Sequence, residues 1–305
     1  MTQPLRVYLG PKGNAHIEQA IIRAGGRLAE FDEAEVAVWT STDPQTWLQL
    51  GENREHVQWV QLLSAGVETW FEADAFDHDR AWTSAAGAYA YTVAEHALGL
   101  LLGVRRRFPE SARVQRWESL DGETVRGSTT VIVGCGSIGQ ALIPMLASVG
   151  SDVIAVTRSG REVEGAVESH DPSTLAEIWP RVDAVVLAAP ATDHTRHVID
   201  SRVLKLLPDD AVLINVARGS LVDTEALVDA LTAGTIGGAG IDVTDPEPLP
   251  DGHPLWTMPN VLITPHVANP PRTLHVRLAD RIEENVRRYI ADEPLLGRVD
   301  LEERY

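Results

Sequence analysis

The chain has 305 residues, enough for about two domains, and 44% of them are hydrophobic, as is usual for a globular protein. Its net charge of −18, from 44 acidic and 26 basic residues, argues against nucleic acid and anionic membranes as general partners, because both bind basic surfaces. A single cysteine, Cys135, excludes an internal disulfide and a zinc site built from cysteines, and we expect no metal.

The N-terminal third alternates between predicted strands and helices. Its start, "MTQPLRVYLG", lacks the charged start and apolar core of a signal peptide, which favours a reducing, cytoplasmic location. An apolar run predicts a strand at Leu5–Gly10. In the helix predicted next, Ile17, Ala20, Ile21 and Ala24 share one face, and two glycines end it. Further strands are predicted in "EVAVWTS", "VQWVQLLSAG" and "AWTSAA".

A long, mostly buried helix is predicted from Tyr91 to Arg107, and a loop then leads into a second, more regular series. The strands of this series are rich in Val, Ile and Ala and alternate with helices, which predicts a parallel sheet covered on both faces. A charged helix, Arg272–Ile290, follows it. The predicted strands are Thr129–Val133, Val153–Thr157, Ala184–Ala188, Ala211–Val216, Ala239–Val243 and Val261–Thr264.

The segment "VIVGCGSIGQALIPMLASVG" (131–150) carries no charge, so a membrane span has to be considered. Three central glycines followed by Pro144 argue against one. The glycines instead form G-x-G-x-x-G between a predicted strand and a predicted helix, the pattern that binds a dinucleotide pyrophosphate at a helix N-terminus; the alternative is a purely structural turn. Inside the helix, Pro144 should produce a kink. The predicted cofactor residues of this turn are Gly134, Gly136, Ser137, Ile138 and Gly139.

The end of the next strand bears on the choice between NAD and NADP. An NAD site usually has Asp or Glu about 20 residues beyond the glycines, to bind the ribose 2′-hydroxyl. Here Thr157, Arg158 and Ser159 stand instead. Arg158 can pair with a 2′-phosphate, and the two hydroxyls can donate to it. NADP(H) is therefore favoured, and NAD(H) remains possible.

Four polar residues leave the ends of later strands, where open α/β sheets bind ligands. Arg218 offers a planar fork that matches a carboxylate, and His266 is a natural proton donor near neutral pH. Glu247, in a Pro-rich loop, and Asp242, at a strand end, could support them. Each residue alone has an ordinary structural explanation, but together they indicate a catalytic site.

At these residues the chain resembles the D-isomer-specific 2-hydroxyacid dehydrogenases, a family that includes glycerate, hydroxypyruvate, phosphoglycerate and D-lactate dehydrogenases. The resemblance covers about residues 59–290 and is weak in the first fifty. Within the family, "TRSG" is most similar to the NADPH-using glyoxylate and hydroxypyruvate reductases. The motifs that carry the resemblance are "SAGVE" (64–68), "VAEHALGLLL" (93–102), "GCGSIG" (134–139), "NVARGSLVD" (215–223), "GIDV…EPLP" (240–250) and "TPHVA" (264–268).

The resemblance implies a role for each catalytic residue. Arg218 would bind the carboxylate and the carbonyl oxygen of a small 2-keto acid. His266 would give a proton to that oxygen during reduction, and Glu247 would pair with His266 and favour its protonated form. Hydride would pass between the nicotinamide and C2 of the substrate.

The resemblance also implies binding roles outside this triad. Backbone N–H groups around Ala65, Gly66 and Val67 would hold the substrate carboxylate. Asp242 would accept a hydrogen bond from the nicotinamide carboxamide, and Pro190 would border the adenosine.

The family architecture implies two Rossmann-like, doubly wound α/β domains that face each other across a cleft. Residues 1–96 and 272–305 would form the substrate domain, and residues 97–271 the inserted cofactor domain. The loop after Arg107 would be the arm of a homodimer. A formate dehydrogenase is disfavoured because Glu247 stands where those enzymes have Gln. The other alternative is a nucleotide-sensing protein of the corepressor type, with little or no catalysis.

Overall fold

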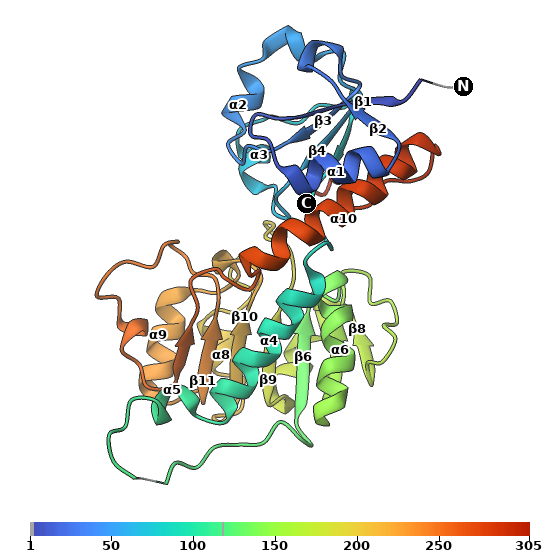
Figure 1. Cartoon of the computed structure of the whole chain (residues 1–305). Coiled ribbons are helices and arrows are strands. Elements are labelled where there is room, and N and C mark those ends of the chain that lie inside the picture. Colours follow the sequence, from blue (N-terminus) through green and yellow to red (C-terminus); the bar gives the residue numbers. More distant parts are fainter. Residues whose placement is uncertain (1–2, 118) are drawn as a thin grey trace. The chain divides into compact units, whose positions relative to one another are not determined.

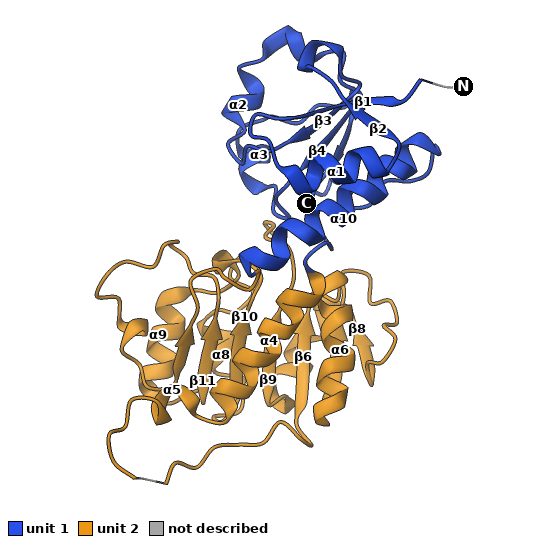
Figure 2. Cartoon of the chain, viewed as in Figure 1, with its two compact units in different colours: residues 1–89, 270–305 blue, residues 90–269 orange. Residues whose placement is uncertain are grey.

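The computed structural model describes residues 3–117 and 119–305 and divides the chain into two compact units (Figure 2). Unit 1 comprises residues 1–89 and 270–305, and unit 2 comprises residues 90–269. The expected division at 96/97 falls inside helix α4 (Ala90–Arg105), whereas the units divide before this helix. The reason is packing, because Ala94, Ala97 and Leu101 of α4 belong to the apolar core of unit 2.

Unit 1 contains a five-stranded parallel sheet in the order β2-β1-β3-β4-β5 (Figure 1). Its core is aromatic: the rings of Trp47 and Trp82 lie 5.5 Å apart, and both side chains are almost fully buried. The strands are β1 (Leu5–Gly10), β2 (Gly26–Leu28), β3 (Val36–Trp39), β4 (Trp59–Leu62) and β5 (Ala81–Thr83), and the helices are α1 (Ala15–Arg23), α2 (Gln45–Leu48), α3 (Glu68–Glu72) and α10 (Pro271–Ile290).

Helix α10 comes from the far end of the chain and packs on α1, and buried polar contacts fix it to the sheet. The Asn285 side chain is fully buried; its amide donates to Gln61 Oε1 at 2.8 Å and to the Leu296 carbonyl at 2.9 Å. These bonds satisfy groups that would otherwise be costly to bury. The C-terminal helix thus completes unit 1.

Unit 2 contains a seven-stranded parallel sheet in the order β12-β11-β10-β9-β6-β7-β8. Along β6, Val131 and Val133 enter one apolar core and Ile132 the other, so both faces of the sheet are covered. The predicted α/β fold with two Rossmann-like units is confirmed. The strands are β6 (Thr129–Val133), β7 (Asp152–Val156), β8 (Glu168–His170), β9 (Ala184–Leu187), β10 (Val212–Asn215), β11 (Gly238–Ile241) and β12 (Val261–Ile263); the remaining helices are α5 (Phe108–Ser111), α6 (Ser137–Val149), α7 (Leu175–Ile178), α8 (Ser201–Leu204) and α9 (Thr224–Ala233).

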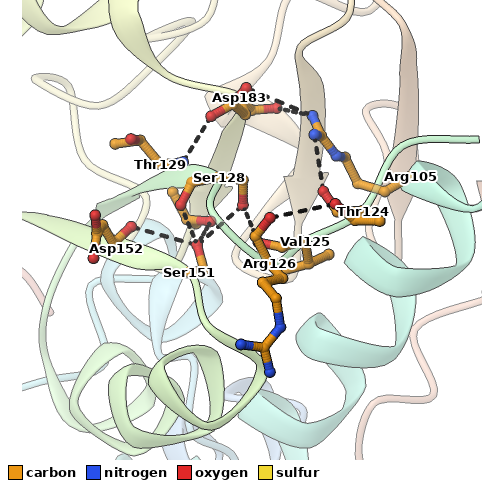
Figure 3. A network of polar contacts seen from close by, with 10 residues as sticks. Arg105, Thr124, Val125, Arg126, Ser128, Thr129, Ser151, Asp152 and Asp183 are labelled. Carbon is orange, nitrogen blue, oxygen red and sulfur yellow. Dashed lines mark hydrogen bonds and ion pairs between the residues drawn. The ribbon is translucent and has the colours of Figure 1, made fainter.

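A polar network closes the amino-terminal edge of this sheet (Figure 3). Arg105, at the end of α4, is 6% exposed and donates to the carbonyls of Asp183 and Thr124. The Asp183 carboxylate accepts the Thr129 N–H at 2.6 Å, and the Ser128 and Ser151 hydroxyls meet at 3.2 Å. The network fastens the chain that returns from the loop after Arg107. Within the described residues, no helix is long and apolar enough to span a membrane.

Helix α6 runs without interruption through Pro144, which is exposed on its outer side. Because proline removes a backbone hydrogen bond and crowds the preceding turn, we expect Pro144→Ala to raise the free energy of unfolding by about 1–3 kcal/mol. Urea denaturation of the full chain measures this. Ser148→Ala, also exposed on α6, should shift it by less than about 0.5 kcal/mol. A Pro144→Ala protein less stable than the wild type would show that the proline suits the helix.

Candidate active site

The glycine turn joins β6 to α6 at the point where the order of strands reverses, between β6 and β9. Gly134 has φ +96°, and a Cβ atom there would lie 2.4 Å from the Ala189 nitrogen of the loop after β9. At Gly139 a Cβ atom would lie 2.9 Å from the Gly134 oxygen, so this glycine permits the close approach of helix and strand. Both requirements explain why glycine occupies these positions.

Gly136 differs from the other two glycines because a Cβ atom on it would meet nothing within 4 Å. It immediately precedes α6, and no side chain caps this helix end. Ser137 is exposed and Ile138 half-buried at the first two positions of the helix, where backbone N–H groups lack helical acceptors. Among the described residues, the turn therefore leaves open space beside N–H groups that lack helical acceptors, which fits a dinucleotide pyrophosphate. Pro190 directly follows Ala189 and is exposed next to this turn.

The end of β7 carries an unsatisfied polar atom. Thr157 is 8% exposed, and its buried hydroxyl oxygen has no hydrogen-bond partner among the residues that the structure describes. Arg158 and Ser159 follow it and are exposed. A buried hydroxyl is normally paired, so this one fits a ligand such as an adenosine ribose or its phosphate.

The sequence analysis overlooked Arg161 on the same loop. Its guanidinium donates to the Cys135 carbonyl at 3.2 Å and so connects the loop after β7 to the glycine turn.

Burial raises the pKa of the Cys135 thiol to about 11, so this cysteine is a packing group and not a nucleophile.

Arg218 follows β10 on a turn fixed by Asn215, which is 1% exposed. The Asn215 side chain donates to the Arg218 carbonyl at 2.9 Å and accepts the Ala217 N–H at 3.0 Å. A Cβ atom on Gly219 would lie 2.0 Å from the Thr244 carbonyl carbon, so the turn packs tightly against the segment after β11. These supporting roles were not predicted, because in the sequence Asn215 is only a polar residue near the end of a predicted strand.

The structure brings Glu247 and His266 together. His266 Nδ1 lies 2.6 Å from Glu247 Oε1, and the two side chains are 54% and 42% exposed. A carboxylate can only accept, so Nδ1 carries a hydrogen. His266 itself has φ +53°, a backbone conformation that residues other than glycine rarely adopt. Its backbone N–H donates to the Asp242 carbonyl at 2.7 Å.

Asp242 follows β11 and is 3% exposed. Its Oδ1 accepts from the Thr264 hydroxyl at 2.6 Å and from the Val267 N–H at 3.0 Å, and its Oδ2 accepts from the Ala268 N–H at 3.1 Å. His96 Nε2 of α4 lies 3.3 Å from Oδ1. Burial raises the pKa of Asp242, but these donors outweigh it and lower the pKa to about 2. A role towards the nicotinamide carboxamide stays a prediction.

The predicted site residues fall in both units. Ala65, Gly66 and Val67 lie in unit 1, between β4 and α3, with Ala65 exposed and Val67 buried. The others lie in unit 2, where the parallel strands β10, β11 and β12 are neighbours, so that Arg218, Asp242 and His266 follow the same edge of the sheet. Within the described part of the chain, no cluster of His, Cys, Asp or Glu side chains is arranged to hold a metal ion.

Comparison with known protein families gives a match that covers most of unit 2. Residues 98–268 match the family described as D-isomer specific 2-hydroxyacid dehydrogenase, NAD binding domain. An uncharacterized Corynebacterium melassecola protein is 36% identical and covers 92% of this chain and 94% of its own length. A glyoxylate reductase of Thermofilum pendens is 35% identical over 67% of this chain and 63% of its own length.

Solved structures are similar over the whole chain. A D-isomer specific 2-hydroxyacid dehydrogenase from Xanthobacter autotrophicus, in complex with NADPH and MES, is 30% identical with a TM-score of 0.86 and covers 100% of both chains. An NADPH-dependent glyoxylate/hydroxypyruvate reductase from Sinorhizobium meliloti, in complex with NADP and malonate, is 26% identical with a TM-score of 0.77. The second alignment covers 99% of this chain and 98% of the other.

The two kinds of glycine predict different mutant phenotypes. Gly136→Ala should leave the free energy of unfolding within about 0.5 kcal/mol of wild type but weaken NADPH binding about tenfold or more, because the methyl group enters the open space of the turn. Gly134→Ala should lower stability by more than about 1 kcal/mol, because of its positive φ and the clash with Ala189. Urea denaturation and fluorescence titration with NADPH measure both. Equal stability losses in the two variants would contradict this distinction.

Proposed function

Because the chain belongs to the D-isomer-specific 2-hydroxyacid dehydrogenase family, we propose that it is an NADPH-dependent reductase of small 2-keto acids, of the glyoxylate/hydroxypyruvate reductase type. The observation that carries the proposal is the Glu247–His266 pair, which stands at the edge where the strands of the dinucleotide-binding sheet end. Arg218 leaves the same edge. Together they supply a proton donor and a carboxylate-binding cation.

The residues around the glycine turn fit a bound dinucleotide. The N–H groups of Ser137 and Ile138 would hold the pyrophosphate beside Gly136, and Pro190 would border the adenosine. When bound, the nicotinamide supplies the hydride that reduces C2 of the keto acid. Side chains and backbone groups of this chain would bind the substrate, orient it and supply the proton.

His266 is the proposed proton donor. Because Nδ1 is committed to Glu247, Nε2 is the ring nitrogen that would face the substrate oxygen. The protonated ring would give its Nε2 proton to the C2 oxygen as the hydride arrives at C2, which yields the 2-hydroxy acid and a neutral imidazole. Glu247 would hold the ring in one orientation and stabilise its charged form. Arg218 would bind the substrate carboxylate and polarise the C2 carbonyl.

The substrate carboxylate would also be held by backbone N–H groups around Ala65, Gly66 and Val67 of unit 1. The name of the Sinorhizobium relative and the malonate bound to it support a small carboxylic acid as the substrate. Glyoxylate and hydroxypyruvate are the acids named for several relatives and are the first candidates here.

Three observations support NADP(H) over NAD(H). Thr157 stands where NAD-dependent relatives carry a carboxylate, its buried hydroxyl has no partner among the described residues, and Arg158 follows it. Two relatives of known structure hold NADPH or NADP. Use of NAD(H) is the alternative.

We further propose that the loop after Arg107 mediates a homodimer. This loop leaves α4 and carries the exposed side chains of Phe108, which is 58% exposed, and Trp117, which is fully exposed. Aromatic side chains are enriched in protein interfaces, so such exposure supports burial against a second copy. A cytoplasmic location stays a prediction of the sequence.

The reductase is tested with the purified full chain on glyoxylate, hydroxypyruvate, pyruvate, phenylpyruvate and 2-oxoglutarate, by following the loss of reduced nicotinamide absorbance. We expect turnover with one or more acids, and His266→Asn should lower kcat by about a hundredfold or more, because it removes the proton donor. His16→Asn, exposed on α1 in unit 1, is the control and should retain full activity. Tight NADPH binding without any turnover would instead favour a nucleotide sensor.

The choice of cofactor is tested at Thr157. Thr157→Asp should lower the NADPH-to-NADH ratio of kcat/KM by about tenfold or more, because a carboxylate repels the 2′-phosphate. Thr157→Val removes the hydroxyl without adding charge and should lower the ratio less. Steady-state kinetics with each cofactor measure the ratio. If the Asp variant keeps or raises it, this strand end does not read the phosphate.

A further inference from the structure

His96 lies on α4, 168 positions from Thr264 in the chain, yet it contacts the loop that carries His266. Its Nε2 lies 2.8 Å from Thr264 Oγ1 and 3.3 Å from Asp242 Oδ1. The His96 side chain is 23% exposed, so it is neither a core residue nor a fully solvated one. The apolar packing of α4 comes from other positions, among them Ala94, Ala97 and Leu100. The polar contact is therefore the distinctive property of His96.

The hydrogen atoms in this cluster can be assigned from the acceptors. The Asp242 carboxylate only accepts, so the Thr264 hydroxyl must donate to Oδ1 across their 2.6 Å contact. Thr264 Oγ1 has a single hydrogen, so it can only accept from His96. His96 Nε2 must then carry a hydrogen, and the chain of donors runs from His96 through Thr264 to Asp242.

Asp242 passes this constraint to the backbone of His266 and of the two residues that follow it. Its carbonyl accepts the His266 N–H, and its carboxylate accepts the N–H groups of Val267 and Ala268. These bonds hold His266 in a left-handed conformation that costs free energy and persists only where its surroundings enforce it. They also fix the point from which the imidazole reaches Glu247 at 2.6 Å.

We propose that His96 is a positioning residue of the active site. Its Nε2–H donates to the Thr264 hydroxyl and lies 3.3 Å from Asp242 Oδ1, so it holds both groups in place from α4. Asp242 then holds the backbone of residues 266–268 in the conformation that directs the His266 ring. His96 would thus act through this chain of contacts and not on the reacting atoms. The catalytic consequence rests on the proposed reductase function, whereas the effect on the loop does not.

Two substitutions test the N–H donor of His96 separately from the volume of its side chain. His96→Gln keeps an N–H donor at a similar reach, and His96→Leu fills similar space without a donor. We expect His96→Leu to lower kcat ten- to a hundredfold with less than a threefold change in KM, since a displaced proton donor slows the reaction more than it weakens binding. His96→Gln should stay within about threefold of the wild-type kcat. Glu95→Gln, at the exposed neighbouring position on α4, is the matched control and should leave kcat unchanged.

Amide hydrogen exchange of the full chain without substrate gives a readout that needs no activity. The Val267 and Ala268 amides should exchange at least tenfold faster in His96→Leu and at the wild-type rate in His96→Gln, with the melting temperature unchanged in both. A wild type without turnover would refute the reductase but leave this exchange test valid. The positioning role is overturned by unchanged exchange in His96→Leu, by equal impairment of both variants, or by a lower kcat without faster exchange.

Discussion

The site in unit 2 depends on one buried carboxylate. Asp242 is almost fully enclosed and is surrounded by four donors from α4, the end of β12 and the loop after it. Burying an ionised group is costly unless it is hydrogen-bonded, so the donors and the charge require one another. Without the Asp242 side chain, the N–H groups of Val267 and Ala268 would lose their acceptors, and the backbone that follows the positive φ of His266 would lose this support. The histidine proposed as the proton donor, which lies on an exposed loop, thereby acquires a rigid support.

The two edges of the seven-stranded sheet are used differently. At the carboxyl-terminal edge, glycine and short polar residues leave open space and unsatisfied groups, as at Gly136 and Thr157. At the amino-terminal edge, Arg105 and Asp183 form hydrogen bonds with the backbone of the fold, although Arg105 Nε has no partner among the described residues (Figure 3). Parallel strands place all their carboxyl ends on one side, so ligand-binding groups gather there while the opposite edge can be devoted to stability.

Much of this arrangement could be predicted from the sequence, because local patterns determine it. Runs of Val, Ile and Ala predict the buried strands of unit 2, and G-x-G-x-x-G between a strand and a helix predicts the turn at Gly134. The three-residue strand β8 was not predicted, since its pairing with β7 defines it and its own residues are polar and half-buried. Helix α4 was divided between the units because its apolar pattern does not reveal which sheet it covers.

The supporting residues of the site were harder to find. In "VAEHALGLLL", His96 stands within an apolar helix, and nothing nearby in the sequence indicates a partner. Its contact with Thr264 exists only because α4 crosses β11 and β12 in the folded unit. Asn215 and Arg161 escaped notice for the same reason, since each acts through backbone groups that no side-chain pattern reveals. Sequence motifs identify groups that touch ligands more readily than groups that hold them in place.

The low pKa of Asp242 separates the support of the site from its chemistry. A carboxyl group whose pKa is lowered by folding stabilises the folded state above its ordinary pKa, near 4, and loses that contribution as the pH falls towards about 2. Around neutral pH the carboxylate therefore stays ionised, and the loop of residues 264–268 keeps its hydrogen bonds. The hydrogen bonds that hold the backbone after His266 therefore keep their acceptor throughout the range in which the proposed reaction would run, since the Asp242 carboxylate does not lose its charge there.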